Sequence, residues 1–336
     1  MRYSQYLTVL VSLANASPIT SFAIPDLATV LSQHAKLSTL NSLLKQFDLF
    51  DAITSFKNIT IIAPTDQAYL DLANWGFNVS EIPAPIARAL LEYHIIDGTY
   101  ISESIPDNDL EPEVVHTYLK PPTLTNVSTG AALKLSREAS GRVTTISGLG
   151  VQGGVEEADV LFNGGVLHTL NASMVLPHNI SITAMLNGLT TFLTLMDTAG
   201  VVEEFESAKD VTVFIPTNRA LAKVSVLMKM LPQQQLATIL RSHIVANDVV
   251  YGKQLGQATT LVTIGGTRLS VHSDKEGHIQ VGNADVVRED IILYGGVAHV
   301  VDDVLLPEVD TDLSWQYSYG HQDLLAGSHQ RQPLPI

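Results

Sequence analysis

One phrase occurs twice in this chain, and its repetition constrains the fold more than any other feature does. Residues 164–177 read GGVLHTLNASMVLP, and residues 295–307 read GGVAHVVDDVLLP. Apolar side chains alternate along both phrases between a glycine pair and a proline, as they do along a half-buried strand. A length of 336 residues already suggests two domains. The repeated phrase therefore predicts that one structural unit has been duplicated.

A second pair of segments recurs ahead of these phrases. Residues 58–69 and 210–221 each read as an alternating strand that runs into Pro-Thr and then into a helix. Thr65 and Thr217 stand where an N-cap hydroxyl would accept a hydrogen bond from the first helical turn. Each half therefore predicts a strand, a tight turn and a helix in the same place.

A helix that ends at a histidine follows in each half. Residues 82–100 and 231–251 place apolar side chains three and four positions apart, which is the spacing of one helical face. His94 and His243 come at the end of these runs. Two branched apolar residues follow each histidine and predict a change into a strand.

A hairpin completes each unit. Residues 155–168 and 287–299 both read as a strand, a glycine-containing turn and a second strand. Helical segments over residues 25–53 and 182–205 open the two halves. Because all these segments keep the same order, the sequence predicts two domains in tandem.

The two copies differ in length at one place. The interval from His94 to His168 is longer than the interval from His243 to His299. The surplus is expected around residues 105–126, which contain four prolines. Proline-rich stretches break regular elements, so this segment is predicted to be a loop insertion.

Composition excludes several classes of protein. Hydrophobic residues make up 46% of the chain and charged residues 16%, which is enough apolar surface for real cores. The net charge of −15 opposes binding to nucleic acid or to anionic lipid. Cysteine is absent from the sequence, so no disulfide, thiolate metal site or cysteine nucleophile is available.

The N-terminus and the sequons indicate secretion. Residues 1–16 have the basic start, short apolar core and small-residue end of a signal peptide. Asn-x-Ser/Thr acceptor sites for N-glycans follow at Asn58, Asn78, Asn126, Asn171 and Asn179. No later apolar run is long enough for a transmembrane helix, and the polar tail 310–336 does not resemble a lipid-anchor signal. We expect an extracellular or wall-associated protein, with the vacuole as the alternative.

Together, the Pro-Thr segments, the Tyr93-His94 pair and the Gly-Val-x-His phrases resemble the fasciclin (FAS1) domain family. The resemblance covers about residues 22–309, with one domain at 22–178 and a second at 179–309. It implies an α+β fold in which a mostly antiparallel β-wedge packs with a helical layer. It also implies an adhesion module of a matrix, a cell wall or a cell surface.

The resemblance further implies partner-binding residues. Family members carry an Asp-Ile adhesion pair just before the second phrase, and a Tyr-His region. The pair is Asp290-Ile291 in the second copy and becomes Asp159-Val160 in the first, while Tyr93-His94 is the matching Tyr-His pair. Neither copy carries the whole set unaltered: the first has valine in place of the isoleucine of the pair, and the second has serine in place of the tyrosine before its histidine.

Histidines support two alternative roles. We expect His94, His168, His243 and His299 to bond backbone groups inside each domain, since an unpaired buried polar group costs about 1–3 kcal/mol. Alternatively, His94 and His168, or His116 in the inserted segment, would act as acid and base in a pocket of the first copy. A pKa of about 6.5 suits such proton transfer.

No cofactor or metal site is predicted. The four repeated histidines lack the short spacing of a helical metal pair. Residues 148–153 match a Gly-x-Gly-x-x-Gly pattern, but a strand-like segment follows them, whereas a dinucleotide site needs a helix there.

Two functions remain from different classes. The first is a non-catalytic adhesion, matrix or wall protein whose two domains bind an extracellular or wall protein or a glycan. The second is a small-molecule binder or tailoring enzyme of a biosynthetic pathway, with a histidine-lined pocket in the first domain. A deep pocket lined by two histidines would favour the second function, and a flat acidic surface would favour the first.

Overall fold

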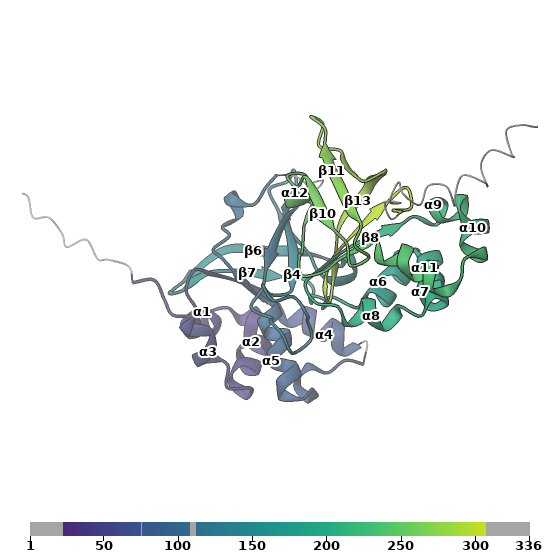
Figure 1. Cartoon of the computed structure of the whole chain (residues 1–336). Coiled ribbons are helices and arrows are strands. Elements are labelled where there is room, and N and C mark those ends of the chain that lie inside the picture. The colour runs from purple at the N-terminus through teal and green to yellow at the C-terminus, as the bar shows by residue number, and fades with distance from the viewer. Residues whose placement is uncertain (1–22, 75, 108–111, 307–336) are drawn as a thin grey trace, which may run out of the picture.

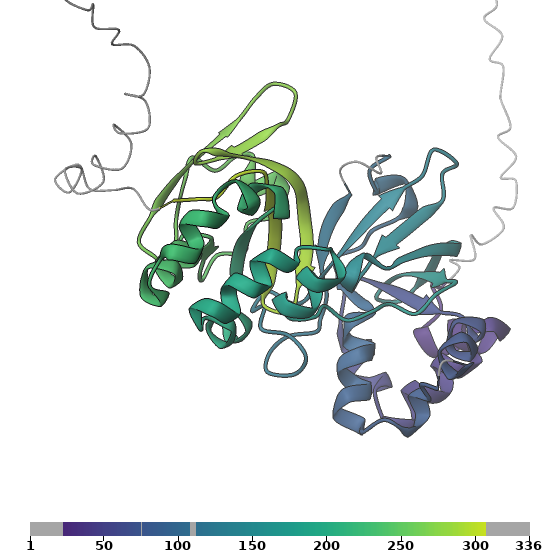
Figure 2. The same cartoon turned by 90° about the vertical axis from the view of Figure 1, so that its right-hand side faces the viewer.

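The computed structural model describes residues 23–306, apart from residue 75 and residues 108–111. These residues form two α+β domains that lie side by side, which confirms the predicted fold class (Figures 1 and 2). Figure 1 shows the sheets between two groups of helices, one purple to blue and one green. The predicted signal peptide 1–16 and the tail 310–336 lie outside the described residues.

The first domain combines a seven-stranded sheet with short helices. Its helices are α1 (Leu27–Gln33), η1 (Ala35–Leu37), α2 (Ser38–Gln46), α3 (Phe50–Ser55), α4 (Asp66–Asn74), η2 (Val79–Glu81), α5 (Ala84–Tyr93), η3 (Ser102–Ser104) and η4 (Gly148–Gly150). Its strands are β1 (Ile59–Pro64), β2 (Ile95–Asp97), β3 (Glu113–His116), β4 (Ala132–Arg137), β5 (Val143–Ile146), β6 (Gln152–Phe162) and β7 (Gly165–Leu170). The strand order is β2-β1-β7-β6-β5-β4-β3.

The second domain repeats this plan. Its helices are α6 (Ile180–Leu186), α7 (Thr190–Ala199), α8 (Val202–Ser207), α9 (Asn218–Lys223), α10 (Ser225–Met230), α11 (Gln233–Arg241) and α12 (Gly252–Leu255). Its strands are β8 (Val211–Pro216), β9 (Ile244–Val245), β10 (Thr260–Val262), β11 (Arg268–Ser273), β12 (Ile279–Val281), β13 (Ala284–Leu293) and β14 (Gly296–Val301). The order β10-β11-β12-β13-β14-β8-β9 matches the first sheet position by position, so the duplication predicted from the repeated phrases is present in the fold.

A parallel strand pair explains the repeated glycines. β7 runs parallel to β1 with Gly165 opposite Ile59, and β14 runs parallel to β8 with Gly296 opposite Val211. A β-carbon on Gly165 would lie 1.8 Å from the carbonyl oxygen of Ile59, and one on Gly296 would lie 1.9 Å from that of Val211. Both strands therefore begin at a position that only glycine fills without moving the neighbouring strand.

We expect Gly296→Ala to lower the free energy of unfolding by roughly 1–3 kcal/mol, because the added methyl group overlaps the β8 backbone. The matched control is Gly256→Ala, where the nearest atoms would lie 3.6 Å from the new β-carbon. Urea unfolding followed by circular dichroism measures both changes. Equal midpoints for the two variants would show that β14 can move away from β8 without cost.

Each domain has its own core. In the first domain, one apolar cluster joins α1–α3 to β1 and β7, and a second lies under β4–β6. In the second domain, one cluster joins α6–α8 and α11 to β8 and β14, and another lies under β10–β13. Helix on one side and strand on the other is the packing expected of an α+β unit.

The segment predicted as an inserted loop, residues 105–126, is partly a strand. Residues 113–116 form β3, which occupies the sheet edge that β10 occupies in the second domain. Most of the extra length lies between β3 and β4, over residues 117–131, which overlap the predicted segment, whereas the shorter stretch 263–267 joins β10 to β11. The prolines suggested a loop throughout, but the backbone of 113–116 pairs with β4 before the Pro-Pro pair is reached.

The two predicted threonine caps behave differently. The Thr217 hydroxyl accepts a hydrogen bond from the backbone N–H of Ala220 at 3.1 Å, as an N-cap does. The Thr65 hydroxyl is buried without a hydrogen-bond partner among the described residues, so the prediction of a cap there was wrong. The next side chain, Asp66, instead accepts from the backbone N–H of Thr39 at 2.7 Å and ties α4 to α2.

Within residues 23–306, leaving aside residue 75 and residues 108–111, no helix has both the length and the hydropathy required to cross a membrane.

Candidate functional site

His168 lies in β7 with its side chain sealed from solvent. Its Nε2 lies 2.8 Å from the carbonyl oxygen of Tyr100, and its Nδ1 accepts from the backbone N–H of Asp159 at 3.2 Å. These partners place the ring proton on Nε2 and use both nitrogens. Burial lowers the pKa of His168, so the ring is neutral near pH 7.

His94 lies at the end of α5 and is bonded on one side. Its Nδ1 donates to the carbonyl oxygen of Leu90 at 2.7 Å. Its Nε2 is buried and has no hydrogen-bond partner among the described residues. Burial lowers the pKa of His94 to about 4.

The second domain reverses this arrangement. His243, the counterpart of His94, donates from Nδ1 to Ile239 at 2.9 Å and accepts at Nε2 from the backbone N–H of Leu305 at 3.0 Å. Burial lowers its pKa to about 4. His299, the counterpart of His168, is the half-bonded ring, because Nε2 lies 2.8 Å from the carbonyl oxygen of Val250 while Nδ1 is buried without a partner among the described residues.

The difference between His94 and His243 has an origin in the sequence. The first copy of the repeated phrase is one residue longer between its histidine and its final proline. In that copy the backbone N–H of Val175 donates to the hydroxyl of Ser147 at 3.1 Å. The corresponding N–H in the second copy is that of Leu305, which reaches His243. One extra residue therefore leaves His94 without its second bond.

Three hollows stand out in the first domain, and none of the three brings two histidines together. The cavity beside His94 has a volume of about 10 Å³, and its other lining side chains are leucine and isoleucine. That volume admits at most one water molecule. The two open hollows, of about 370 and 700 Å³, have no histidine among their lining residues.

His116, the third residue of the catalytic alternative, lies at the contact between the domains. Its ring packs edge-on against Tyr251 of the second domain, with centroids 5.6 Å apart. Its Nδ1 lies 3.1 Å from the carbonyl oxygen of Gly130. None of the three hollows is lined by more than one of His94, His116 and His168.

The Asp-Ile pair of the second domain faces the first domain. The Nζ atom of Lys134 in β4 donates to the backbone oxygen of Asp290 at 3.0 Å. Beside this bond, Ala132, Tyr251, Ile292 and Val297 form one apolar cluster across the boundary. The contact between the domains therefore combines an apolar cluster with a hydrogen bond. No role for Lys134 was predicted from the sequence.

The two aspartates of the predicted adhesion pairs have structural bonds of the same kind. Asp159 and Asp290 have φ angles of 63° and 55°, and both lie where the register of a long strand shifts. The Asp159 carboxylate accepts from the backbone N–H and the hydroxyl of Ser102, and the Asp290 carboxylate accepts from the backbone N–H of Gly252 at 2.8 Å. Both residues are half-buried.

The other predicted partner-binding residues are less accessible. Tyr93 is fully buried, and its hydroxyl donates to the carbonyl oxygen of Ala132 at 3.0 Å. His94 is buried beside it, while Val160 and Ile291 are partly buried against the cores of their domains. In this conformation the Tyr93 and His94 side chains are inside the first domain, and the Asp-Val and Asp-Ile positions are half-buried.

The five sequons differ in exposure. Asn58, Asn78 and Asn171 are exposed, whereas Asn126 and Asn179 are half-buried. The Asn179 Oδ1 atom accepts from the backbone N–H of Ile182 at 3.0 Å and caps α6. The Asn179 Nδ2 atom makes no hydrogen bond with the described residues, and the Asn78 Nδ2 atom donates to the exposed carboxylate of Glu81 at 2.7 Å.

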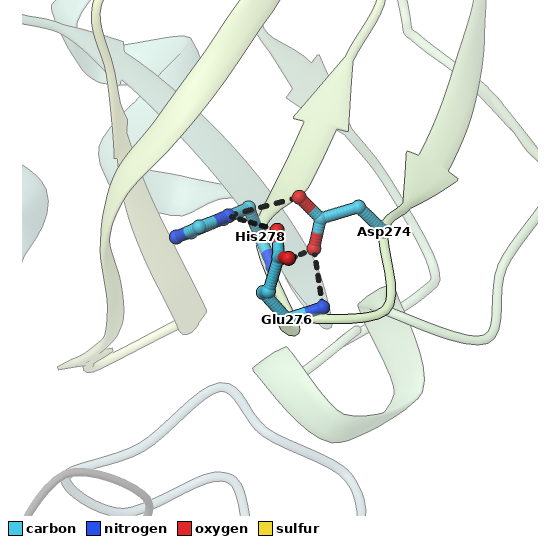
Figure 3. A group of neighbouring side chains, drawn as sticks. All are labelled: Asp274, Glu276 and His278. Atoms are coloured by element: carbon cyan, nitrogen blue, oxygen red, sulfur yellow. Dashed lines mark hydrogen bonds and ion pairs between the residues drawn. The ribbon is translucent and has the colours of Figure 1, made fainter.

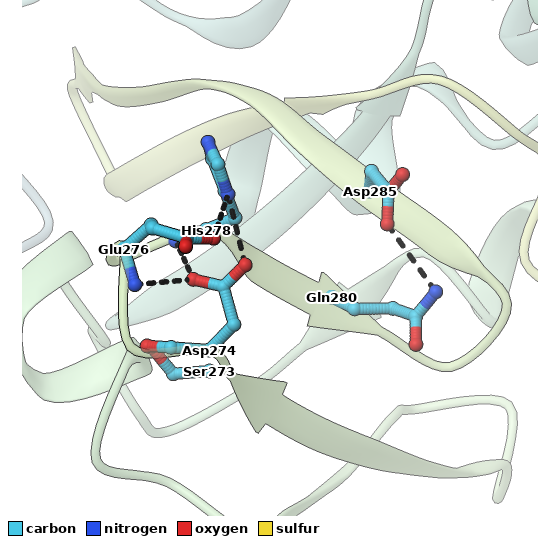
Figure 4. Close-up of polar contacts among 6 residues, drawn as sticks. All are labelled: Ser273, Asp274, Glu276, His278, Gln280 and Asp285. Carbon is cyan, nitrogen blue, oxygen red and sulfur yellow. Dashed lines mark hydrogen bonds and ion pairs between the residues drawn. The ribbon is translucent and has the colours of Figure 1, made fainter.

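An exposed acidic turn was not singled out from the sequence. Asp274, Glu276 and His278 lie in the β11–β12 turn, with ligand-type atoms within 4.8 Å of one another (Figure 3). Figure 4 shows that these side chains already bond within the turn: Asp274 accepts from the N–H groups of Glu276 and His278 at 2.9 Å, and its other oxygen lies 2.9 Å from Nδ1 of His278. The Asp-x-Glu-x-His spacing is the signal that could have found it.

The electrostatics of this turn are local. The hydrogen bond that the His278 ring donates to the Asp274 carboxylate raises the pKa of His278, and the same bond lowers the pKa of Asp274. Carboxylate and imidazole groups are ligands for divalent transition metals. The hydrogen bonds within the turn account for the arrangement without an ion, and the side chains are exposed.

Two similar α+β units with internal histidines define a tandem-domain protein. The fasciclin domain model matches residues 35–177 and 187–307, so the chain belongs to the fasciclin family. It is 57% identical over 283 residues to the Fasciclin-like arabinogalactan protein elcF of Phaeosphaeria nodorum, over 84% of this chain and 89% of that protein. It is 41% identical over 292 residues to the Fasciclin-like arabinogalactan protein CTB11 of Cercospora beticola, over 86% and 78%.

A solved structure is also similar. The FAS1 domain pair of the insect cell adhesion molecule Fasciclin I matches 82% of this chain and 98% of its own, at 19% identity and a TM-score of 0.39.

Proposed function

We propose that the chain is a secreted, non-catalytic adhesion or cell-wall protein that binds an extracellular protein or glycan. The observation that carries this proposal is the use of the four repeated histidines: all four are buried, and each bonds the backbone of its own domain. Membership of the fasciclin family and similarity to proteins named fasciclin-like arabinogalactan proteins support an extracellular or wall setting.

The first domain is the better candidate for the external contact. The backbone oxygen of Asp290 accepts from Lys134 of the first domain, whereas the hydrogen bonds of Asp159 among the described residues stay within its own domain. Beside Asp159, the open hollow of about 700 Å³ is lined by polar and charged side chains that include Ser102, Arg142 and Glu156. Positively charged, negatively charged and hydroxyl side chains in an open hollow can hydrogen-bond a polar partner, whereas an apolar metabolite needs an enclosed apolar pocket.

Binding to isolated cell-wall material tests the location of this surface. We expect Arg142→Glu to reduce retention of the purified protein by about tenfold or more, the effect of losing one well-placed charged contact. The control is Lys229→Glu, which makes the same charge change at an exposed position of α10 in the second domain. Equal retention of wild type and both variants would reject the first-domain surface.

A deletion strain tests the function itself. We expect altered attachment or wall behaviour with an unchanged profile of small metabolites. A changed metabolite profile with normal attachment would reject the adhesion proposal and favour the pathway alternative.

A further inference from the structure

The sequon at Asn126 lies in the contact between the two domains. It belongs to the long β3–β4 connection, residues 117–131, that distinguishes the first copy. The backbone N–H of Asn126 donates to Tyr294 at 2.8 Å, and its side-chain Nδ2 donates to the carbonyl oxygen of Ser207 at 3.3 Å. Nδ2 is the atom to which an N-glycan would be attached. The nitrogen atom that would carry the glycan is therefore already hydrogen-bonded to the second domain.

Ser128, the hydroxyl residue of the same sequon, is also hydrogen-bonded to the second domain. Ser128 donates from its backbone N–H to Oδ1 of Asp210 at 2.7 Å and from its hydroxyl to Oδ2 at 2.6 Å. The backbone N–H of Asp210 in turn points to the carbonyl oxygen of Asn126, at 3.4 Å. Val127 between them is buried, with 1% of its surface exposed. Asn126 and Ser128 thus form part of the domain contact, with the buried Val127 between them.

An exposed sequon of the same domain shows the contrast. Asn171 follows β7, and its Oδ1 accepts from the backbone N–H of Gly154 at 2.8 Å. Its Nδ2 makes no hydrogen bond with the described residues, and the side chain is exposed. A glycan at Asn171 would extend into solvent, whereas a glycan at the half-buried Asn126 would begin beside the end of α8.

We propose that an N-glycan on Asn126 and the closed domain pair exclude one another. An N-glycan replaces one of the two hydrogens on Nδ2 while the other points to the oxygen of Ser207 3.3 Å away, so the first sugar ring would lie against the end of α8. This crowding would keep the domains of a modified chain apart at the contact. The sequon precedes the second domain in the chain, and modification can therefore occur before that domain is made. Unmodified chains close, and modified chains remain open.

Opening would uncover the backbone oxygen of Asp290, which otherwise accepts from Lys134, and the interdomain apolar cluster that includes the neighbouring Ile292. This consequence rests on the proposed function, because it adds a second surface for the external partner. The exclusion between glycan and closed pair does not depend on it.

The absence of cysteine from the sequence allows a direct test. Single variants Asn126→Cys and Asn171→Cys are treated with a thiol-reactive polymer of glycan size. We expect position 171 to react equally fast in native and urea-unfolded protein, and position 126 to react at least about tenfold more slowly in the native protein. Equal native rates at the two positions would overturn the proposal.

Amide hydrogen exchange measures whether the two domains remain in contact. We expect polymer at position 126 to remove the protection of the Ser128 and Asp210 amides, relative to the unlabelled variant, while polymer at position 171 leaves that protection intact. Retained protection in fully labelled Asn126→Cys protein would show that the closed pair tolerates a bulky group, and would likewise overturn the proposal.

A change on the second domain tests whether this contact shields the sequon. Asp210→Gly, introduced into the Asn126→Cys protein, removes both acceptors of Ser128, and glycine suits the φ of 48° at this position. Asn is avoided there because it would create a new sequon with Val211 and Thr212. We expect labelling at position 126 to accelerate about tenfold, and an unchanged rate would contradict the assignment of the shield.

Discussion

His243→Ala is expected to lower the free energy of unfolding by about 3–5 kcal/mol. The ring is fully buried, so its removal leaves a cavity in the core of the second domain. It also leaves the buried backbone N–H of Leu305 without its partner, whereas the carbonyl oxygen of Ile239 still accepts from the N–H of Ser242 at 3.1 Å. Urea unfolding, followed by circular dichroism and read as two transitions if the domains unfold separately, measures the change.

The matched comparison is His94→Ala in the first domain. His94 makes one side-chain hydrogen bond where His243 makes two, so we expect a loss that is smaller by roughly 1 kcal/mol. His278→Ala serves as the exposed control and should change stability little. If His243→Ala were no more destabilising than His278→Ala, the histidines would not be holding the domains together.

Stability is expected to fall as the pH is lowered from about 6.5 to about 4, by about 3 kcal/mol for each of His94 and His243. Burial lowers the pKa of both rings from the ordinary 6.5 to about 4. In this range the unfolded chain binds a proton on each ring and the folded chain does not, so protons favour unfolding. Below about 4 both states are protonated, and these two rings add no further loss.

Urea unfolding at pH 7 and at pH 4.5 measures this dependence. His94→Gln removes one titrating ring and should flatten the pH dependence of the first-domain transition. His278→Gln is the control of opposite sign: the pKa of His278 is raised, so its contribution is present below its unfolded pKa and is lost as the pH rises. An unchanged slope in His94→Gln would show that other groups cause the acid sensitivity.

Local patterns in the sequence predicted most of the fold. The strand ending in Pro-Thr, the helix ending at a histidine and the glycine hairpin each appeared twice, and each has the predicted type in both domains. These features depend on side-chain spacing within a few residues, which a sequence displays directly. The pairing of residues 113–116 with β4 was missed because an edge strand depends on a partner that the local pattern does not name.

The candidate sites were less predictable, for a geometric reason. Sequence spacing placed His94 and His243 in equivalent positions, but one extra residue in the first phrase moves the N–H that would bond His94. Similarly, Asp290 was predicted to bind an external partner, whereas its backbone oxygen accepts a hydrogen bond from Lys134 of the first domain. A hydrogen bond fails with a shift of about 1 Å, and such shifts arise from the packing of distant segments.

The repeated phrases were enough to establish the duplicated unit, the order of its elements and the inward position of its histidines, since periodic burial is written into neighbouring residues. The pairing of the two domains, and with it the fate of Asn126 and Asp290, came from the folded arrangement alone. It depends on contacts such as Ser128 with Asp210, between residues that no local pattern connects.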